Sequence, residues 1–237
     1  MLACVDVIPA IDVTKGRSRI VYWPGASTGV GTPTDRPDRI AERFVVAGAR
    51  QLHLVDFDGA VKGSPVNLEA VGSVAARVAV PLQVAGGLED PEHVRLVFAV
   101  GATRVVLSLA IIDRPDVLRA CLAVAGDWLA VGLDPRPERI AAFPWRRTTP
   151  PAVDALVGEL VGSGVRRLVL SHGSEAADPA LLESLVRRHD ADILVAGGTT
   201  DLAAIRRLKD VGVAGVIVGE ALLSGQLDFP AALEAAA

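Results

Sequence analysis

A regular alternation of short apolar runs with longer stretches of helical spacing is the feature that most constrains the fold. Eight such runs occupy residues 5–11, 51–56, 82–85, 104–108, 129–134, 167–171, 193–196 and 216–219. Runs this apolar predict strands buried on both faces, as in a parallel sheet covered by helices. Eight strands close a βα barrel, which typically has about 250 residues. We therefore predict an α/β fold, a single (βα)8 TIM barrel with residues 1–237 as one domain.

The chain also repeats itself. At an offset of 111 residues, Gly86-Gly87 aligns with Gly197-Gly198 and Asp90 aligns with Asp201. A long ungapped register of this kind predicts that the barrel consists of two duplicated half-barrels. The alternative is that any two strand–helix units share such features.

Composition narrows the class of protein further. Aromatic residues make up only 4% of the chain, which favours the close helix-on-strand packing of an α/β fold. The net charge of −4 and the lack of long basic runs argue against a nucleic-acid partner. Cys4 and Cys121 are the only cysteines, so no disulfide framework is expected, and a reducing cytoplasm fits. No apolar run approaches the roughly 20 residues of a membrane span, so we expect no membrane association.

Two carboxylates stand where barrel enzymes carry their chemistry. Asp12 and Asp134 each end an apolar strand, in matching places of the two halves. Burying an unpaired carboxylate is costly, and two opposed carboxylates can be tuned apart into one base and one acid. The alternative is that each caps a loop or pairs with an arginine such as Arg17 or Arg136. The symmetric placement favours the catalytic interpretation.

Glycines that follow strands and precede helices predict phosphate binding. Backbone N–H groups at such turns converge on an anion together with a helix N-terminus. The second glycine pair is strengthened by nearby hydroxyl and backbone donors, so we expect a small phosphorylated metabolite as the partner. The predicted phosphate-binding residues are Gly86, Gly87, Gly197, Gly198, Thr199, Gly219 and Glu220. The alternative is that the glycines serve only the tight turns.

Other polar residues are candidates for the site or for packing. Asp56 and His172 occupy matching strand ends of the two halves, so either could line the cavity. His53 alternates with leucines and is interpreted as a packing histidine inside the barrel. The four histidines lack metal-binding spacing, so neither a metal nor an organic cofactor is expected.

Aspartates beside prolines predict where several helices begin. Asp90, Asp113, Asp178 and Asp228 each precede a proline by one or two residues. A carboxylate at the N-cap and a proline in the first turn favour a helix start. The longest stretches without such a pattern are 23–36 and 135–151.

Two motifs resemble a known family. Ile8-Pro9-Ala10-Ile11-Asp12-Val13 with Gly16, and the segment from His53 to Ala60 with Gly63 and Asn67, are similar to the phosphoribosylformimino-aminoimidazole carboxamide ribotide isomerase of histidine biosynthesis. The resemblance runs essentially along the full length. It implies a duplicated βα barrel that interconverts an aminoaldose and an aminoketose in a substrate with two phosphates. The sister cyclase of the same pathway shares the barrel and both aspartates but resembles the second-strand motif less.

The resemblance also implies residue roles. Asp12 is then the general base and Asp134 the general acid of an Amadori rearrangement, which needs no cofactor. Ser171 falls where the family usually has an assisting threonine, and Trp145 corresponds to an indole that stacks on the substrate. A loop-anchoring role is the alternative for Trp145. A monomer is expected.

Three departures from the family pattern concern the substrate. Ser171-His172-Gly173-Ser174-Glu175 replaces an aspartate-rich loop, Ala85 and Glu89 replace a glycine and an arginine, and Ser108-Leu109 replaces Gly-Thr or Gly-Ser. They predict a weaker phosphate site in the N-terminal half. A bifunctional or drifted relative that acts on phosphoribosylanthranilate, and a non-catalytic barrel that binds a phosphorylated ligand, therefore stay open as alternatives.

Overall fold

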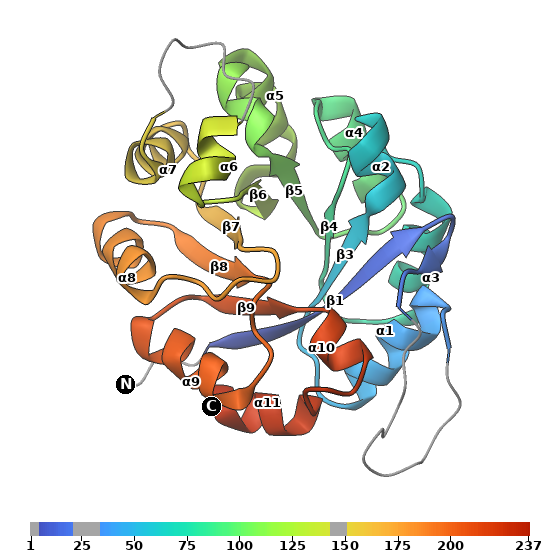
Figure 1. The fold of residues 1–237 in the computed structure, drawn as a ribbon. Coiled ribbons are helices and arrows are strands. Elements are labelled where there is room, and N and C mark those ends of the chain that lie inside the picture. Colours follow the sequence, from blue (N-terminus) through green and yellow to red (C-terminus); the bar gives the residue numbers. More distant parts are fainter. Residues whose placement is uncertain (1–4, 21–33, 143–150) are drawn as a thin grey trace.

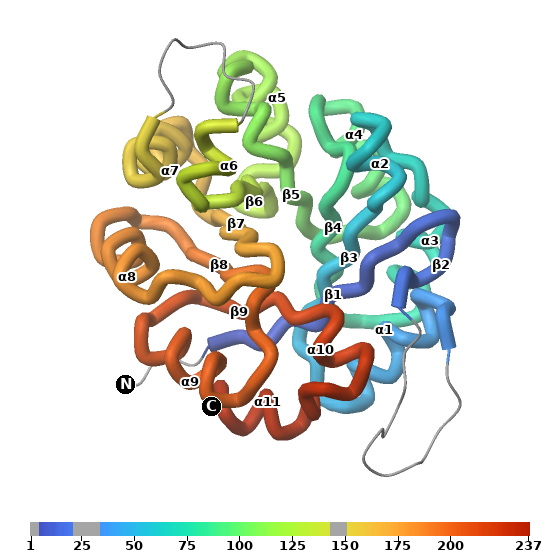
Figure 2. The backbone as a smooth tube through the Cα atoms, viewed as in Figure 1, coloured from blue at the N-terminus to red at the C-terminus, as the bar shows by residue number. Residues whose placement is uncertain are grey.

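The predicted strands form a closed parallel barrel (Figure 1). The structure is a computed structural model and describes residues 5–20, 34–142 and 151–237. Neighbouring strands pair in sequence order, and β1 pairs with β9 to close the barrel. Figure 2 shows this closure, with the C-terminal strands beside the N-terminal one. The barrel strands are β1 (Asp6–Thr14), β3 (Leu52–Asp56), β4 (Leu82–Ala85), β5 (Arg104–Ser108), β6 (Leu129–Leu133), β7 (Arg167–Ser171), β8 (Asp192–Ala196) and β9 (Gly215–Val218).

Helices surround the barrel on its outside (Figure 1). They are α1 (Pro37–Val46), α2 (Phe57–Lys62), α3 (Leu68–Arg77), α4 (Pro91–Ala99), α5 (Pro115–Ala125), α6 (Pro137–Ala142), α7 (Val153–Gly162), α8 (Pro179–Arg188), α9 (Leu202–Val211), α10 (Glu220–Leu223) and α11 (Phe229–Ala236). Their apolar faces and the outward side chains of the strands form the main core. Within the described residues, no helix is both long and apolar enough to cross a membrane.

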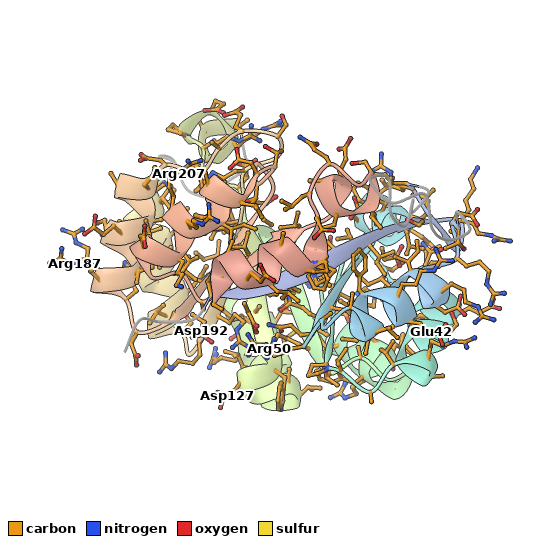
Figure 3. The ribbon with its side chains drawn as sticks, turned by 90° about the horizontal axis from the view of Figure 1, so that it is seen from below. Glu42, Arg50, Asp127, Arg187, Asp192 and Arg207 are labelled. Carbon is orange, nitrogen blue, oxygen red and sulfur yellow. The ribbon has the colours of Figure 1, made fainter. Side chains whose placement is uncertain are left out.

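The barrel interior changes in polarity along its axis. At the end where the strands begin, Gln51 Nε2 donates to Asp6 Oδ2 at 2.7 Å, and Arg104 Nη1 donates to Gln51 Oε1 at 3.0 Å. In Figure 3, Arg50, Asp127 and Asp192 mark this polar end. A barrel closed at this end by polar packing leaves the opposite end, where the strands finish, for a site.

The middle of the barrel is mostly apolar. Ile8, Val106, Ala130 and Leu194 belong to a small buried cluster inside the strands. His53 Nδ1 lies 2.9 Å from Gln83 Nε2, and burial lowers the pKa of His53 to about 4. His53 is therefore neutral at physiological pH and packs inside the barrel as predicted, but it also lines the cavity at the end of the strands.

The two halves of the chain repeat in structure as they do in sequence. Gly86 and Gly197 follow β4 and β8 with φ of 103° and 81°. Asp90 and Asp201 cap the helices α4 and α9 that come next, through side-chain bonds to backbone N–H groups. The ungapped register thus corresponds to the same strand–turn–helix unit in both halves.

Some predicted boundaries were wrong. Asp90, Asp178 and Asp228 cap their helices as predicted, but α5 follows Arg114, because a short 3-10 helix η1 (Leu109–Asp113) includes Asp113. Helix α6 forms within a stretch that lacked a helical pattern. Strand β1 continues past Asp12 because a two-residue strand β2 (Arg17–Ser18) pairs with its end. A second 3-10 helix, η2 (Gly126–Trp128), precedes β6.

Candidate active site

A cavity of about 550 Å³ opens where the barrel strands end. Its size suits a metabolite, since ligand pockets are usually about 300–1,000 Å³. Of the candidates from the sequence, the cavity lining contains Asp12, Asp134, Ser171, Gly197, Gly219 and Glu220. These six residues come from β1, β7 and the segments after β6, β8 and β9, so only closure of the barrel brings them together.

Asp12 lies on the inner face of β1, beside Val55 of β3. Burial raises the pKa of this carboxyl, a nearby Arg19 opposes the shift, and the negative charge of Glu220 adds to it. The Arg19 guanidinium lies 4.0 Å over the ring of Phe57, which also lines the cavity. Asp12 thus gives up its proton less readily than an ordinary aspartate.

Asp134 directly follows β6 and has a different environment. Arg136 donates from Nε to Oδ1 at 2.9 Å and from Nη2 to Oδ2 at 2.6 Å. Burial alone favours a raised pKa, but the hydrogen bonds and charge of Arg136 outweigh it and lower the pKa of Asp134. Of the two alternative arginine partners, Arg136 does pair with Asp134, whereas Arg17 pairs with Asp35 at 3.1 Å.

The two carboxyl groups are therefore tuned apart, as an acid–base pair requires. The direction is unexpected, however. A raised pKa favours a proton donor and a lowered pKa favours an ionised carboxylate. Asp12 therefore has the higher proton affinity of the two and Asp134 the lower, which is opposite in direction to the roles that the resemblance implies.

The glycine pairs have a packing reason for being glycine. A Cβ on Gly86 would lie 2.1 Å from the carbonyl oxygen of Asp56, and a Cβ on Gly197 would lie 2.1 Å from that of Gly173. A Cβ on Gly198 would lie 1.8 Å from the carbonyl oxygen of Glu175. Each turn is thus pressed against the loop after the preceding strand, and the structural alternative for these glycines has direct support.

The remaining predicted phosphate residues divide between two places. Gly197, Gly219 and Glu220 line the central cavity, whereas Gly198 and Thr199 line a separate cleft of about 40 Å³. Gly86 and Gly87 are outside both linings. The Glu220 side chain brings a negative charge near Asp12, which opposes an anion there. Any phosphate contact from this segment must therefore come from its backbone.

Asp56 and His172 lie away from the cavity that they were expected to line. The Asp56 side chain is an N-cap of α2 and is 2% exposed, so it serves the loop behind the site. His172 is buried beside another cavity, which Arg136 and Glu175 also line, and burial lowers its pKa. The side chains diverge because the residue after an inward-facing strand position faces outward. Trp145 lies outside the described residues.

Sequence reasoning missed Phe57 and Arg19 and named Arg136 only as a possible ion-pair partner. The Asp134-Pro135-Arg136 spacing was the available signal for Arg136, because only Pro135 separates it from the carboxylate. Within residues 5–20, 34–142 and 151–237, no cluster of three His, Cys, Asp or Glu side chains could hold a metal ion.

Comparison with known proteins places this geometry in a family. A family described as "Histidine biosynthesis protein" matches residues 6–228. The chain belongs to this histidine biosynthesis family. The matched residues include all eight barrel strands and both aspartates of the cavity. The resemblance seen in the sequence is therefore confirmed.

Curated relatives in the family match over nearly the whole chain. A protein of Roseiflexus castenholzii is 36% identical over 98% of this chain and 99% of its own length. One of Gloeobacter violaceus is 37% identical over 98% of this chain and 94% of its own. One of Chloroflexus aggregans is 33% identical over 97% of each chain. All three are named as an imidazole-4-carboxamide isomerase whose full name contains two phosphoribosyl groups.

Proposed function

We propose that this protein is an intramolecular aldose–ketose isomerase that performs an Amadori rearrangement on a phosphoribosylated aminoimidazole carboxamide in histidine biosynthesis. The observation that carries the proposal is the pairing of Asp12 and Asp134 in one cavity, from matching positions of the two half-barrels. The isomerase names of full-length relatives support the same activity.

The pair meets the chemical needs of this reaction. Opening the ribose ring requires a proton donor for the ring oxygen, and the rearrangement then moves a proton between adjacent carbons. One carboxyl group that gives a proton and one that takes a proton are sufficient, without oxidation or reduction. The side walls of the cavity, which include Val55, Phe57 and Val169, limit water around the reacting carbons.

For the phosphate, we propose contact with the backbone at Gly197 and Gly219, where β8 and β9 end beside each other. Adjoining turns of this kind are a usual phosphate site in barrels. Ser171 is an exposed hydroxyl on the same cavity, well placed to assist as the resemblance implies.

A turnover assay of the purified protein with two substrates tests the function. We expect the protein to convert the imidazole-carboxamide aminoaldose to the aminoketose, and chromatography of substrate and product measures this conversion. Conversion of phosphoribosylanthranilate alone would identify a drifted relative, and production of an imidazole ring would identify a cyclase. Binding of both ribotides without turnover would identify a non-catalytic barrel, and each of these outcomes would refute the proposal.

We also propose that the protein acts as a single-domain monomer in the cytoplasm. All cavity residues named above come from one continuous sheet and its loops in one chain. Cys121 is a free buried thiol whose pKa burial raises to about 11, which suits a reducing compartment. Light scattering coupled to size exclusion tests the monomer, because a dimer would double the mass.

A further inference from the structure

Arg136 holds an unusual position between the loops after two neighbouring strands. Two prolines, Pro135 and Pro137, flank it and restrict the backbone. Its guanidinium binds both carboxylate oxygens of Asp134 and donates from Nη1 to Glu175 Oε1 at 2.7 Å. Only 16% of the Arg136 side chain is exposed. The rigid backbone leaves the side chain as the part that can move.

This ion pair conflicts with one half of the proposed chemistry. A general acid must carry a proton before it can donate one, and a two-pronged arginine contact stabilises the charged carboxylate instead. Asp134 can therefore act as the acid only if Arg136 releases it. Without release, Asp134 remains a carboxylate throughout the reaction.

We propose that Arg136 is a positioning residue that keeps Asp134 ionised until substrate binds and then transfers fully to Glu175, so that Asp134 takes up a proton from solvent and becomes the acid. The inference rests on the proposed isomerase function. It goes beyond that function because it names the residue that sets the protonation state of the pair.

Two other carboxylates lie close enough to Arg136 to replace Asp134 as its partner. Glu175 already accepts one of its hydrogen bonds, and 62% of the Glu175 side chain is exposed, so it can follow the guanidinium. Glu138 lies 3.9 Å from Arg136 Nε and gives a second carboxylate on the outer side. The guanidinium therefore keeps an ionic partner when it leaves Asp134.

Other charges near Asp134 are weaker influences. Arg139 Nε lies 3.8 Å from Oδ2, but 62% of its side chain is exposed to screening solvent. His172, in the loop after β7, interacts at longer range with Asp134, and Glu175 and Asp178 in turn interact with His172. Asp12 lines the cavity across from it. Among these groups only Arg136 donates hydrogen bonds to both oxygens of Asp134.

A carbon NMR titration of the Asp134 carboxyl tests whether Arg136 keeps this group ionised, and it needs no turnover. Aspartate labelled at the carboxyl carbon is incorporated, and the Asp134 signal is assigned by its loss in Asp134→Asn. In Arg136→Gln we expect the titration to move to higher pH than in the wild type. In the matched control Arg139→Gln, the shift should be much smaller. In Glu175→Gln it should move lower, because Arg136 then has Asp134 as its main partner. An Arg136→Gln titration that coincides with the wild-type one overturns the proposal.

The pH dependence of catalysis tests whether Arg136 releases Asp134 when substrate binds. The profile of kcat/KM reports groups of the free enzyme, and that of kcat reports groups of the complex. For the wild type we expect the loss of activity at rising pH to occur at higher pH in kcat than in kcat/KM. In Arg136→Gln the two profiles should approach each other. Coincident wild-type profiles would show that Arg136 does not release Asp134, and would overturn the transfer.

The two tests separate this inference from the proposed function. If the ribotide is not converted, the carbon titration still shows whether Arg136 keeps Asp134 ionised. If the ribotide is converted but the Asp134 signal never reports a protonated carboxyl in the presence of ligand, the isomerase function stands and the transfer is refuted. The roles of the two aspartates are then reversed, with Asp12 as the acid.

Discussion

Replacing Asp56 by alanine should unfold the protein more easily while leaving its chemistry largely intact. The Asp56 carboxylate accepts hydrogen bonds from the backbone N–H groups of Gly59 at 2.8 Å, Val66 at 2.7 Å and Asn67 at 2.9 Å. It also accepts from Asn67 Nδ2 at 2.6 Å. The substitution leaves four donors without their partner in a region where Asp56 is 2% exposed.

The expected loss follows from those donors. Each buried donor left without a partner costs about 1–3 kcal/mol, and water that enters the vacated space offsets part of the sum. We therefore expect the free energy of unfolding to fall by about 3–5 kcal/mol. For a chain of this size, 1 kcal/mol shifts Tm by about 2–4 °C, so Tm should fall by roughly 6–20 °C.

Urea denaturation and steady-state kinetics on the same preparations measure both effects. Below its unfolding transition, the Asp56→Ala variant should keep kcat within about tenfold of the wild type, because Asp56 lies outside the cavity lining. Asp58→Ala is the matched control, since Asp58 also binds Asn67 Nδ2, at 2.9 Å, but is only half-buried, and it should lose far less stability. A variant with unchanged stability and a kcat lowered a hundredfold would refute this reasoning and make Asp56 a site residue.

Three further predictions concern the cavity and its turns. Asp12→Asn and Asp134→Asn should each lower kcat by about 10²–10⁴-fold, and near wild-type kcat in either would make that aspartate structural. The pKa of Asp12 is raised in the folded state, so the wild type loses free energy of unfolding relative to Asp12→Asn as the pH rises through that pKa. Urea titrations should therefore show the variant at least as stable as the wild type at pH 7. In acid, the difference in free energy of unfolding should vanish. Gly198→Ala should lower Tm, because its Cβ would meet the Glu175 carbonyl, whereas Gly162→Ala, with open space in α7, should not.

The strands lie close to their predicted positions, and β5 shows why. Residues 104–108 form β5 as predicted, because an apolar run between polar turns has few ways to bury its side chains. Arg114 shows where local pattern fails. The caps of α4 and α8 follow from a nearby aspartate, but α5 begins after Arg114 because the preceding 3-10 helix uses Asp113. Such a choice depends on how the loop packs, which the local sequence does not specify.

The sequence alone determined the barrel, its repeated halves and the presence of Asp12 and Asp134 at one end. These properties follow from the order of residues along the chain, since parallel strands of similar length bring their ends to one edge. The tertiary structure decided what each residue does there. Asp56 turned away to cap α2, and Arg136 bound Asp134 and inverted the expected proton affinities of the pair. Burial and the distance between charges set these affinities, and both are properties of the folded chain.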